Sequence, residues 1–249
     1  MYDLALALSA VAVLAAVAPI PTASAQQQLP PDSEYVVVDE DGHLTVDGKR
    51  VRFWAAIGQV YGRTKQQPGD TLEEKVENAR RTTDAIIEHF KAVGFNSTRL
   101  WAGFNEDIVY TRGDGSHADN VDYFIYRMKQ EGFKIWLAGS NSPGQIHPDE
   151  AAEWADVIDD PDTEEEWVEA CRKMARGHYK WEGKQTPIHR NLARIWDTRL
   201  EKIGLMRMQK VADHVNLYTG LRWGDDPVFG AWELSNEEWW IRKMLGGQW

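Results

Sequence analysis

The sequence predicts an α/β fold made of parallel βα units, preceded by a small N-terminal β-hairpin. Segments with the spacing of strands alternate with segments with the spacing of helices, and Gly94 and Gly132 each stand before a new strand. A helix that returns the chain between two strands allows those strands to pair in parallel. The 249 residues, 43% of them hydrophobic, are enough to bury a core.

The hairpin is predicted by two short alternating segments, residues 35–38 and 43–46, which are joined through Asp41-Gly42. Asp-Gly between alternating segments is a strong hairpin signal. A second Asp-Gly turn leads into a third strand over residues 50–57, and this strand is apolar enough to enter the core.

The clearest predicted helix covers residues 71–93. Thr71 and Glu74 have the spacing of a capping box, apolar side chains follow one face, and Gly94 ends the helix. A strand over residues 97–101 follows at once. The same pattern then continues with a helix over 119–130, a strand over 133–138, a helix opened by Thr163 and Glu166, a helix over 192–217 and a fourth strand over 228–234.

The N-terminus has the features of an export signal. Residues 4–20 are apolar and uncharged, and Ala23-Ser24-Ala25 follows them as a cleavage site, although no Lys or Arg precedes Leu4. We expect a signal peptide over 1–25, a linker over 26–34, a main domain over 35–249, and a secreted or periplasmic protein without a stable membrane span. An uncleaved membrane anchor is the alternative.

The composition excludes several classes of function. A net charge of −11 argues against non-specific nucleic-acid binding. The single Cys171 excludes an internal disulfide framework. The seven histidines show no zinc-binding spacing, and neither a phosphate-binding loop nor a G-x-S-x-G elbow is present, so no metal and no cofactor are expected. The acidic run over 159–166 is interpreted as a solvated helix start.

The candidate site residues stand where the predicted strands end. Parallel α/β barrels place their active sites at these carboxyl ends. Glu237 follows the fourth strand and is the candidate general acid/base, because a glycosidase needs a protonated carboxyl group to donate to the leaving oxygen. The adjacent Asn236 could bind a sugar hydroxyl. A strand-end cap or a solvated pair is the alternative for both residues.

Other side chains could support this site. Glu233 shares a strand face with Glu237 by period-two alternation and could be a supporting carboxylate below it. Arg99 ends the second strand, where a cation could hold an ionised catalytic carboxylate, with a salt bridge on the rim as the alternative. The expected sugar-stacking faces are Trp101, Trp239 and Trp240. Asp119 and Asp122 are interpreted as caps and scaffold.

Several segments together resemble one enzyme family. They are residues 42–54, 94–101, 121–125, 132–135, 215–221, 225–227 and 232–237. In their order and spacing, over roughly residues 36–240, the chain resembles the clan A glycoside hydrolases and is closest to the cellulase-like glycoside hydrolase family 5.

The resemblance implies a (β/α)8 TIM barrel and retaining hydrolysis of β-linked O-glycosyl bonds in a poly- or oligosaccharide. By position, Glu237 matches the family's acid/base, Asn236 matches its sugar-binding asparagine, and Arg99 matches its arginine on the second strand. Where the family often has a histidine after strand three, this chain has Ser140-Asn141. The family's nucleophile ends strand seven, so we expect a barrel truncated after about the fourth strand, without its nucleophile.

Two alternatives remain open from the sequence. The chain could be a non-catalytic carbohydrate-binding protein or an inactive truncated product. A hydrolase with Glu106 or Asp107 as its second carboxylate is the other, although loop carboxylates are usually solvated. Glucans, mannans and galactosides would all fit tryptophan stacking faces.

Overall fold

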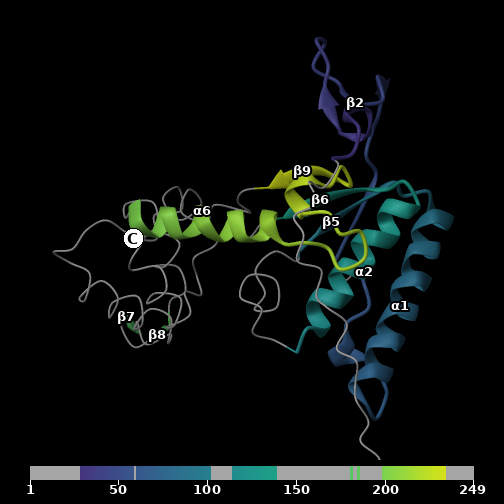
Figure 1. Cartoon of the computed structure of the whole chain (residues 1–249), viewed down its shortest axis with the longest axis vertical. Coiled ribbons are helices and arrows are strands. Elements are labelled where there is room, and N and C mark those ends of the chain that lie inside the picture. Colours follow the sequence, from purple (N-terminus) through teal and green to yellow (C-terminus); the bar gives the residue numbers. More distant parts are fainter. Residues whose placement is uncertain are drawn as a thin grey trace, which may run out of the picture.

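The computed structural model describes residues 29–58, 60–101, 114–138, 180–181, 184–185 and 198–233 (Figure 1). Its central feature is a four-stranded parallel sheet in the order β4-β5-β6-β9. These strands are Ala55–Ile57, Ser97–Leu100, Lys134–Ala138 and Phe229–Glu233. The prediction of parallel βα units is confirmed over this part of the chain.

Helix α1, Leu72–Val93, forms as predicted from its local signals. The side chain of Thr71 accepts a hydrogen bond from the backbone of Glu74, the reciprocal bond is also present, and Gly94 ends the helix at a φ of 87°. Helix α2, Ser116–Gln130, begins three residues earlier than predicted. The N-cap residue is Gly115, and Asp114 before it accepts a hydrogen bond through Oδ1 from the backbone nitrogen of Ser116 at 2.9 Å.

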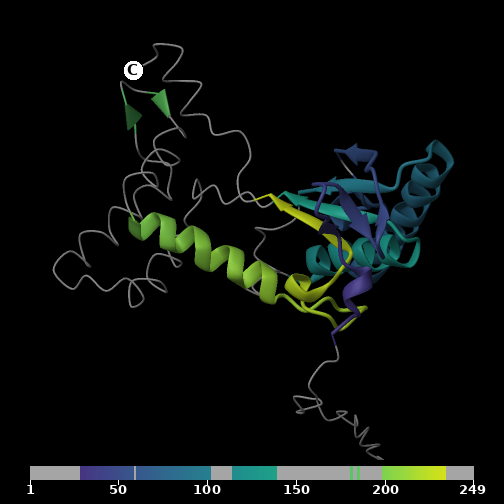
Figure 2. The same cartoon turned by 90° about the horizontal axis from the view of Figure 1, so that it is seen from above.

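Helices α1 and α2 cover one face of the parallel sheet, and both views show them together on that side (Figures 1 and 2). The core between helices and sheet is apolar and fully buried; it includes Ile87, Leu100, Phe124, Ile135 and Leu137. Burial of these side chains is the main stabilising contribution to this layer.

The opposite face of the sheet is open in the part of the chain that the structure describes. Ile57 on β4 and Trp136 on β6 lie on this face and are 67% and 46% exposed. Arg99 pairs in register with both of them and lies on the same face. Parallel sheets are ordinarily covered on both faces, so apolar side chains on this face make it a surface suited to burial.

The N-terminal strands form a separate antiparallel sheet in the order β1-β2-β3, over Val37–Val38, Leu44–Val46 and Lys49–Arg50. The predicted single strand over 50–57 is wrong. It divides into β3 and β4, which belong to different sheets. Asn96 holds the crossing segment between them, because its side chain donates to Arg52 O and accepts from Trp54 N, each at 2.7 Å.

Helix α6, Thr198–Asp213, ends earlier than the predicted helix over 192–217. After it the chain turns back on itself, with an antiparallel bridge between Val215 and Arg222. Helix α6 runs away from α1 and α2 in both views (Figures 1 and 2). Short elements complete the described structure: the 3-10 helices Asp32–Glu34, Thr64–Gln66 and Trp223–Asp225 and a two-stranded sheet of Lys180–Trp181 and Lys184–Gln185.

Several predictions concern residues outside those described. They include the signal peptide over 1–25, linker residues 26–28, Cys171 and the helix at Thr163. Within the described ranges, no helix is both long and apolar enough to cross a membrane.

Candidate active site

An ion pair joins the second and fourth strands on the open face of the parallel sheet. Arg99 Nε donates to Glu233 Oε2 at 2.9 Å, and Arg99 Nη2 donates to Glu233 Oε1 at 2.5 Å. The side chains are 23% and 18% exposed, so the pair is partly withdrawn from solvent. Two parallel hydrogen bonds fix the plane of the guanidinium as well as its distance from the carboxylate.

The ion pair crosses over a strand, because β6 lies between β5 and β9. Ala138 of β6 pairs in register with Glu233, and period-two alternation places it on the same face as Trp136. Although that face is open, Ala138 is only 1% exposed. A methyl group at this position leaves room for the arginine side chain to reach Glu233. The sequence analysis missed this role, since the alanine has no chemical signal of its own.

Trp101 lies directly beyond β5 and contacts the same arginine. The Cζ atom of Arg99 lies 4.5 Å from the centroid of the Trp101 ring, and Trp101 is 39% exposed. This is the geometry of a cation–π contact. One face of the indole is therefore occupied by Arg99, so a sugar ring could stack only on the other face. The sequence-based role of Trp101 in sugar binding stays a prediction.

The structure brings together three residues that the sequence analysis treated separately: Arg99, Trp101 and Glu233. Glu233 lies on the open face with Arg99. The strand face that alternation predicts it to share with Glu237 lies partly outside the described residues. The remaining candidates, Asn236, Glu237, Trp239, Trp240, Ser140, Asn141, Glu106 and Asp107, lie outside the described residues. Their assignments stay predictions.

The start of β9 is fixed by a second carboxylate, Asp226. Its side chain is fully buried, and Oδ1 accepts from Lys129 Nζ on α2 and from the backbone nitrogen of Val228, both at 3.0 Å. Lys134 also contributes at this end of the sheet, because Nζ donates to Pro227 O at 2.7 Å. Burial lowers the pKa of Lys134. These contacts set the position from which β9 delivers Glu233 to the site.

Asp122 anchors the segment between α6 and β9. Its fully buried carboxylate accepts hydrogen bonds from His214 Nε2, from Trp223 Nε1 at 3.0 Å and from the backbone nitrogen of Leu217 at 3.0 Å. Asn216 Nδ2 donates to the backbone carbonyl of Asp122 at 3.1 Å. The scaffold role predicted for Asp122 is confirmed.

Metal ligation is not supported in the described part of the chain, where no group of three or more His, Cys, Asp or Glu side chains could hold a metal ion. The chemistry available at the site is that of a carboxylate at the end of β9 and of a guanidinium and an indole at the end of β5. Such groups bind polar, hydroxylated ligands with a flat apolar face.

No protein-family model matches the chain, and no curated protein matches it. Solved structures do. A mutant of the glycoside hydrolase family 5 mannosidase from Rhizomucor miehei matches with a TM-score of 0.52 and 15% identity, over 82% of this chain and 49% of that one. The endo-beta-1,4-mannanase from Thermotoga petrophila matches with a TM-score of 0.39 and 16% identity, over 77% of this chain and 36% of that one.

The first of these matches shows a shared fold. The predicted resemblance to family 5 glycoside hydrolases is confirmed at this level, as a mixed α/β fold with a four-stranded parallel sheet. The chain spans about half the length of the mannosidase, 49% of it.

Proposed function

We propose, from a fold shared with half of a family 5 glycoside hydrolase, that this chain belongs to an enzyme that cleaves β-linked O-glycosyl bonds. The observation that supports the proposal is the cluster of Arg99, Glu233 and Trp101 on the open face of the parallel sheet. In a complete barrel this face is the interior, and the strand ends beside it form the active site. The substrate class is a β-linked poly- or oligosaccharide.

Glu237 is proposed as the general acid/base, four residues beyond Glu233 on the same predicted strand face. As an acid it protonates the glycosidic oxygen while the sugar–oxygen bond breaks. As a base it then removes a proton from the water that hydrolyses the covalent glycosyl-enzyme intermediate. Asn236 is proposed to bind a hydroxyl of the sugar at which cleavage occurs.

Retention requires a second carboxylate as the nucleophile, about 5–5.5 Å from the first. In the family the nucleophile ends strand seven. Because the chain spans 49% of the length of the mannosidase it resembles, we assign the nucleophile to a part of the barrel outside this sequence. We also propose that the protein is secreted or periplasmic, directed there by residues 1–25.

Turnover and sugar binding in the full-length protein test the proposal. Glu237→Gln should abolish release of reducing sugars from β-mannan or β-glucan, while affinity for the oligosaccharide stays within about threefold, because the amide keeps the shape and loses the proton. Glu131→Gln is the control. Glu131 pairs with Lys91 of α1 and Arg127 of α2, so its substitution should leave turnover unchanged.

Two results would contradict the assignment. Undiminished turnover in Glu237→Gln would remove this residue from the acid/base role. Sugar binding without turnover in the unsubstituted protein would instead support a non-catalytic carbohydrate-binding protein.

A further inference from the structure

We infer that Glu233 is a positioning residue of the proposed sugar-cleaving site, acting through Arg99. Its carboxylate fixes the orientation of the guanidinium at the strand ends, and the guanidinium in turn orients the reacting groups. The inference rests on the proposed function, and it assigns to Glu233 a role in turnover that is separate from any contribution to folding.

The geometry of the ion pair supports an orienting role. The guanidinium approaches the carboxylate side-on, with Nε and Nη2 donating to different oxygens at 2.9 and 2.5 Å. A single point contact would allow rotation about the contact, whereas two parallel bonds leave one plane and one direction. The edge of the guanidinium remote from Glu233, which carries Nη1, therefore has a defined direction.

Trp101 restrains the same group from a second side. Its ring centroid lies 4.5 Å from Arg99 Cζ, so the indole face opposes movement of the guanidinium out of the plane set by Glu233. An ionised carboxylate or a sugar hydroxyl could be held by a cationic edge fixed in this way. Precise placement matters because catalytic groups displaced by about 1 Å can lose about 100-fold in rate.

The pair is long-range, which distinguishes it from a rim contact between neighbouring strands. Strands β5 and β9 are separated by β6, and two strand spacings put their backbones about 10 Å apart. On β6, Arg99 is in register with Trp136 and Glu233 with Ala138, and the small Ala138 side chain leaves space on this face for the contact. The open face is thus built so that one arginine from β5 meets one carboxylate from β9.

A matched ion pair exists elsewhere in the molecule. Arg80 forms the same fork with Asp119, with Nε to Oδ2 at 3.2 Å and Nη2 to Oδ1 at 2.5 Å. Its side chains are 34% and 15% exposed, close to the values for Arg99 and Glu233. It joins α1 to α2, which cover the other face of the sheet, and Asp119 also accepts from the Tyr218 hydroxyl at 2.5 Å, so this pair stabilises the helix layer without the proposed function.

The test compares Glu233→Gln with Asp119→Asn in the full-length protein, using a soluble β-linked oligosaccharide. We expect Glu233→Gln to lower kcat about 100-fold with KM within about threefold, because the orientation of a catalytic group is lost while the binding surface remains. Asp119→Asn should leave kcat within about twofold. Equal effects of the two substitutions would overturn the inference.

A double-mutant cycle with Arg99→Lys separates a positioning role from a merely structural one. If Glu233 acts through Arg99, Glu233→Gln should cause little further loss of kcat once lysine has replaced the arginine. Losses that multiply would show independent roles and would overturn the inference.

A third variant serves if Glu233→Gln does not fold. Ala138→Val keeps both charges but places bulk between them, and it should lower kcat with KM unchanged; an unaltered kcat would contradict the inference. Absence of turnover in the unsubstituted protein would overturn both this inference and the proposed function. Normal turnover with an unaffected Glu233→Gln variant would overturn the inference alone.

Discussion

The carboxylate of Asp122 on α2 lies 2.9 Å from Nε2 of His214, which is 92 positions further along the chain. The same carboxylate accepts hydrogen bonds from Trp223 and from the backbone of Leu217. One side chain therefore connects α2 to the segment that leads from α6 into β9. Because the carboxylate is fully buried, its loss leaves several donors without an acceptor.

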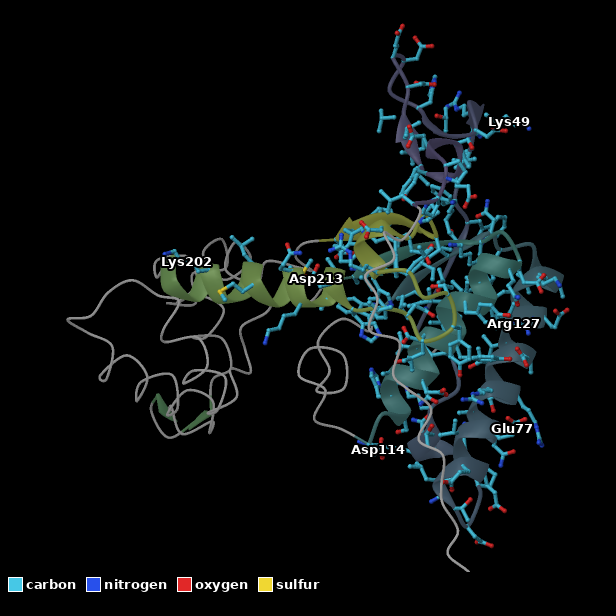
Figure 3. All side chains as sticks on the ribbon, in the orientation of Figure 1. Lys49, Glu77, Asp114, Arg127, Lys202 and Asp213 are labelled. Carbon is cyan, nitrogen blue, oxygen red and sulfur yellow. The ribbon has the colours of Figure 1, made fainter. Side chains whose placement is uncertain are left out.

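Asp122→Ala should destabilise the protein by about 3–5 kcal/mol, because donors on His214, Trp223 and Leu217 lose their acceptor at a cost of about 1–3 kcal/mol each. Urea unfolding followed by circular dichroism measures the change. Glu77→Gln is the control. Glu77 lies on α1 (Figure 3) and forms an exposed pair with Arg81, so its loss should alter stability by less than about 0.5 kcal/mol. Similar losses in the two variants would contradict the role given to Asp122.

Gly62→Ala should be strongly destabilising because there is no space for a side chain. A Cβ atom on Gly62 would lie 2.0 Å from the carbonyl oxygen of Ala79 in α1. The expected loss is about 3 kcal/mol, since the helix backbone must move. Gly132→Ala meets no atom within 4 Å but has a φ of +75°, so it should lose only about 1 kcal/mol. Thermal unfolding measures both variants. A larger loss of stability in Gly132→Ala than in Gly62→Ala would contradict the close contact between Gly62 and α1.

Asn96→Ala should weaken the junction between the N-terminal sheet and β4. Both side-chain bonds to the crossing segment are lost, and we expect a loss of about 1–3 kcal/mol in chemical unfolding. In Asn78→Ala one exposed bond to Pro68 O is lost and helix propensity is gained, so stability should hardly change. A smaller loss of stability in Asn96→Ala than in Asn78→Ala would contradict the role of Asn96 in holding the segment between β3 and β4.

The capping box of α1 should give a pH-dependent contribution to stability. Backbone hydrogen bonds from Asp70 and Thr71 lower the pKa of Glu74. A group with a lowered pKa stabilises the folded state above its unfolded pKa, and this contribution is lost as the pH falls through the folded pKa. Glu74→Gln should therefore be less stable than the parent near neutral pH and approach it in acid.

Thr71 provides the matched comparison for that experiment. Thr71→Ala removes the acceptor for the Glu74 backbone nitrogen and should cost about 1 kcal/mol, whereas Thr71→Ser should retain most of the stability. A Glu74→Gln variant whose deficit stayed constant from neutral to acidic pH would refute the titration argument.

Features with local causes were predictable from the sequence. The capping box at Thr71, the helix end at Gly94 and the strand over 97–101 all depend on residues close in sequence, and each is present in the structure. These signals were sufficient for the βα pattern.

Features that depend on distant partners were not predictable in the same way. The apolar segment over 50–57 looked like one strand, yet Asn96 holds its middle outside either sheet. The helix after residue 192 was expected to continue to 217. It ends at Asp213, and the next residue, His214, bonds to Asp122. The sequence did not identify the partner of Arg99, because that partner depends on the strand register across β6, which no local pattern encodes.

The contact between Arg99 and Glu233 joins residues 134 positions apart. During synthesis from the N-terminus, Arg99 is incorporated long before Glu233 exists, and β9 is made last among the four described strands of the parallel sheet. Contacts of such high sequence separation close slowly in comparison with hairpins and helices. The growing chain therefore carries Arg99 without its carboxylate partner until β9 leaves the ribosome.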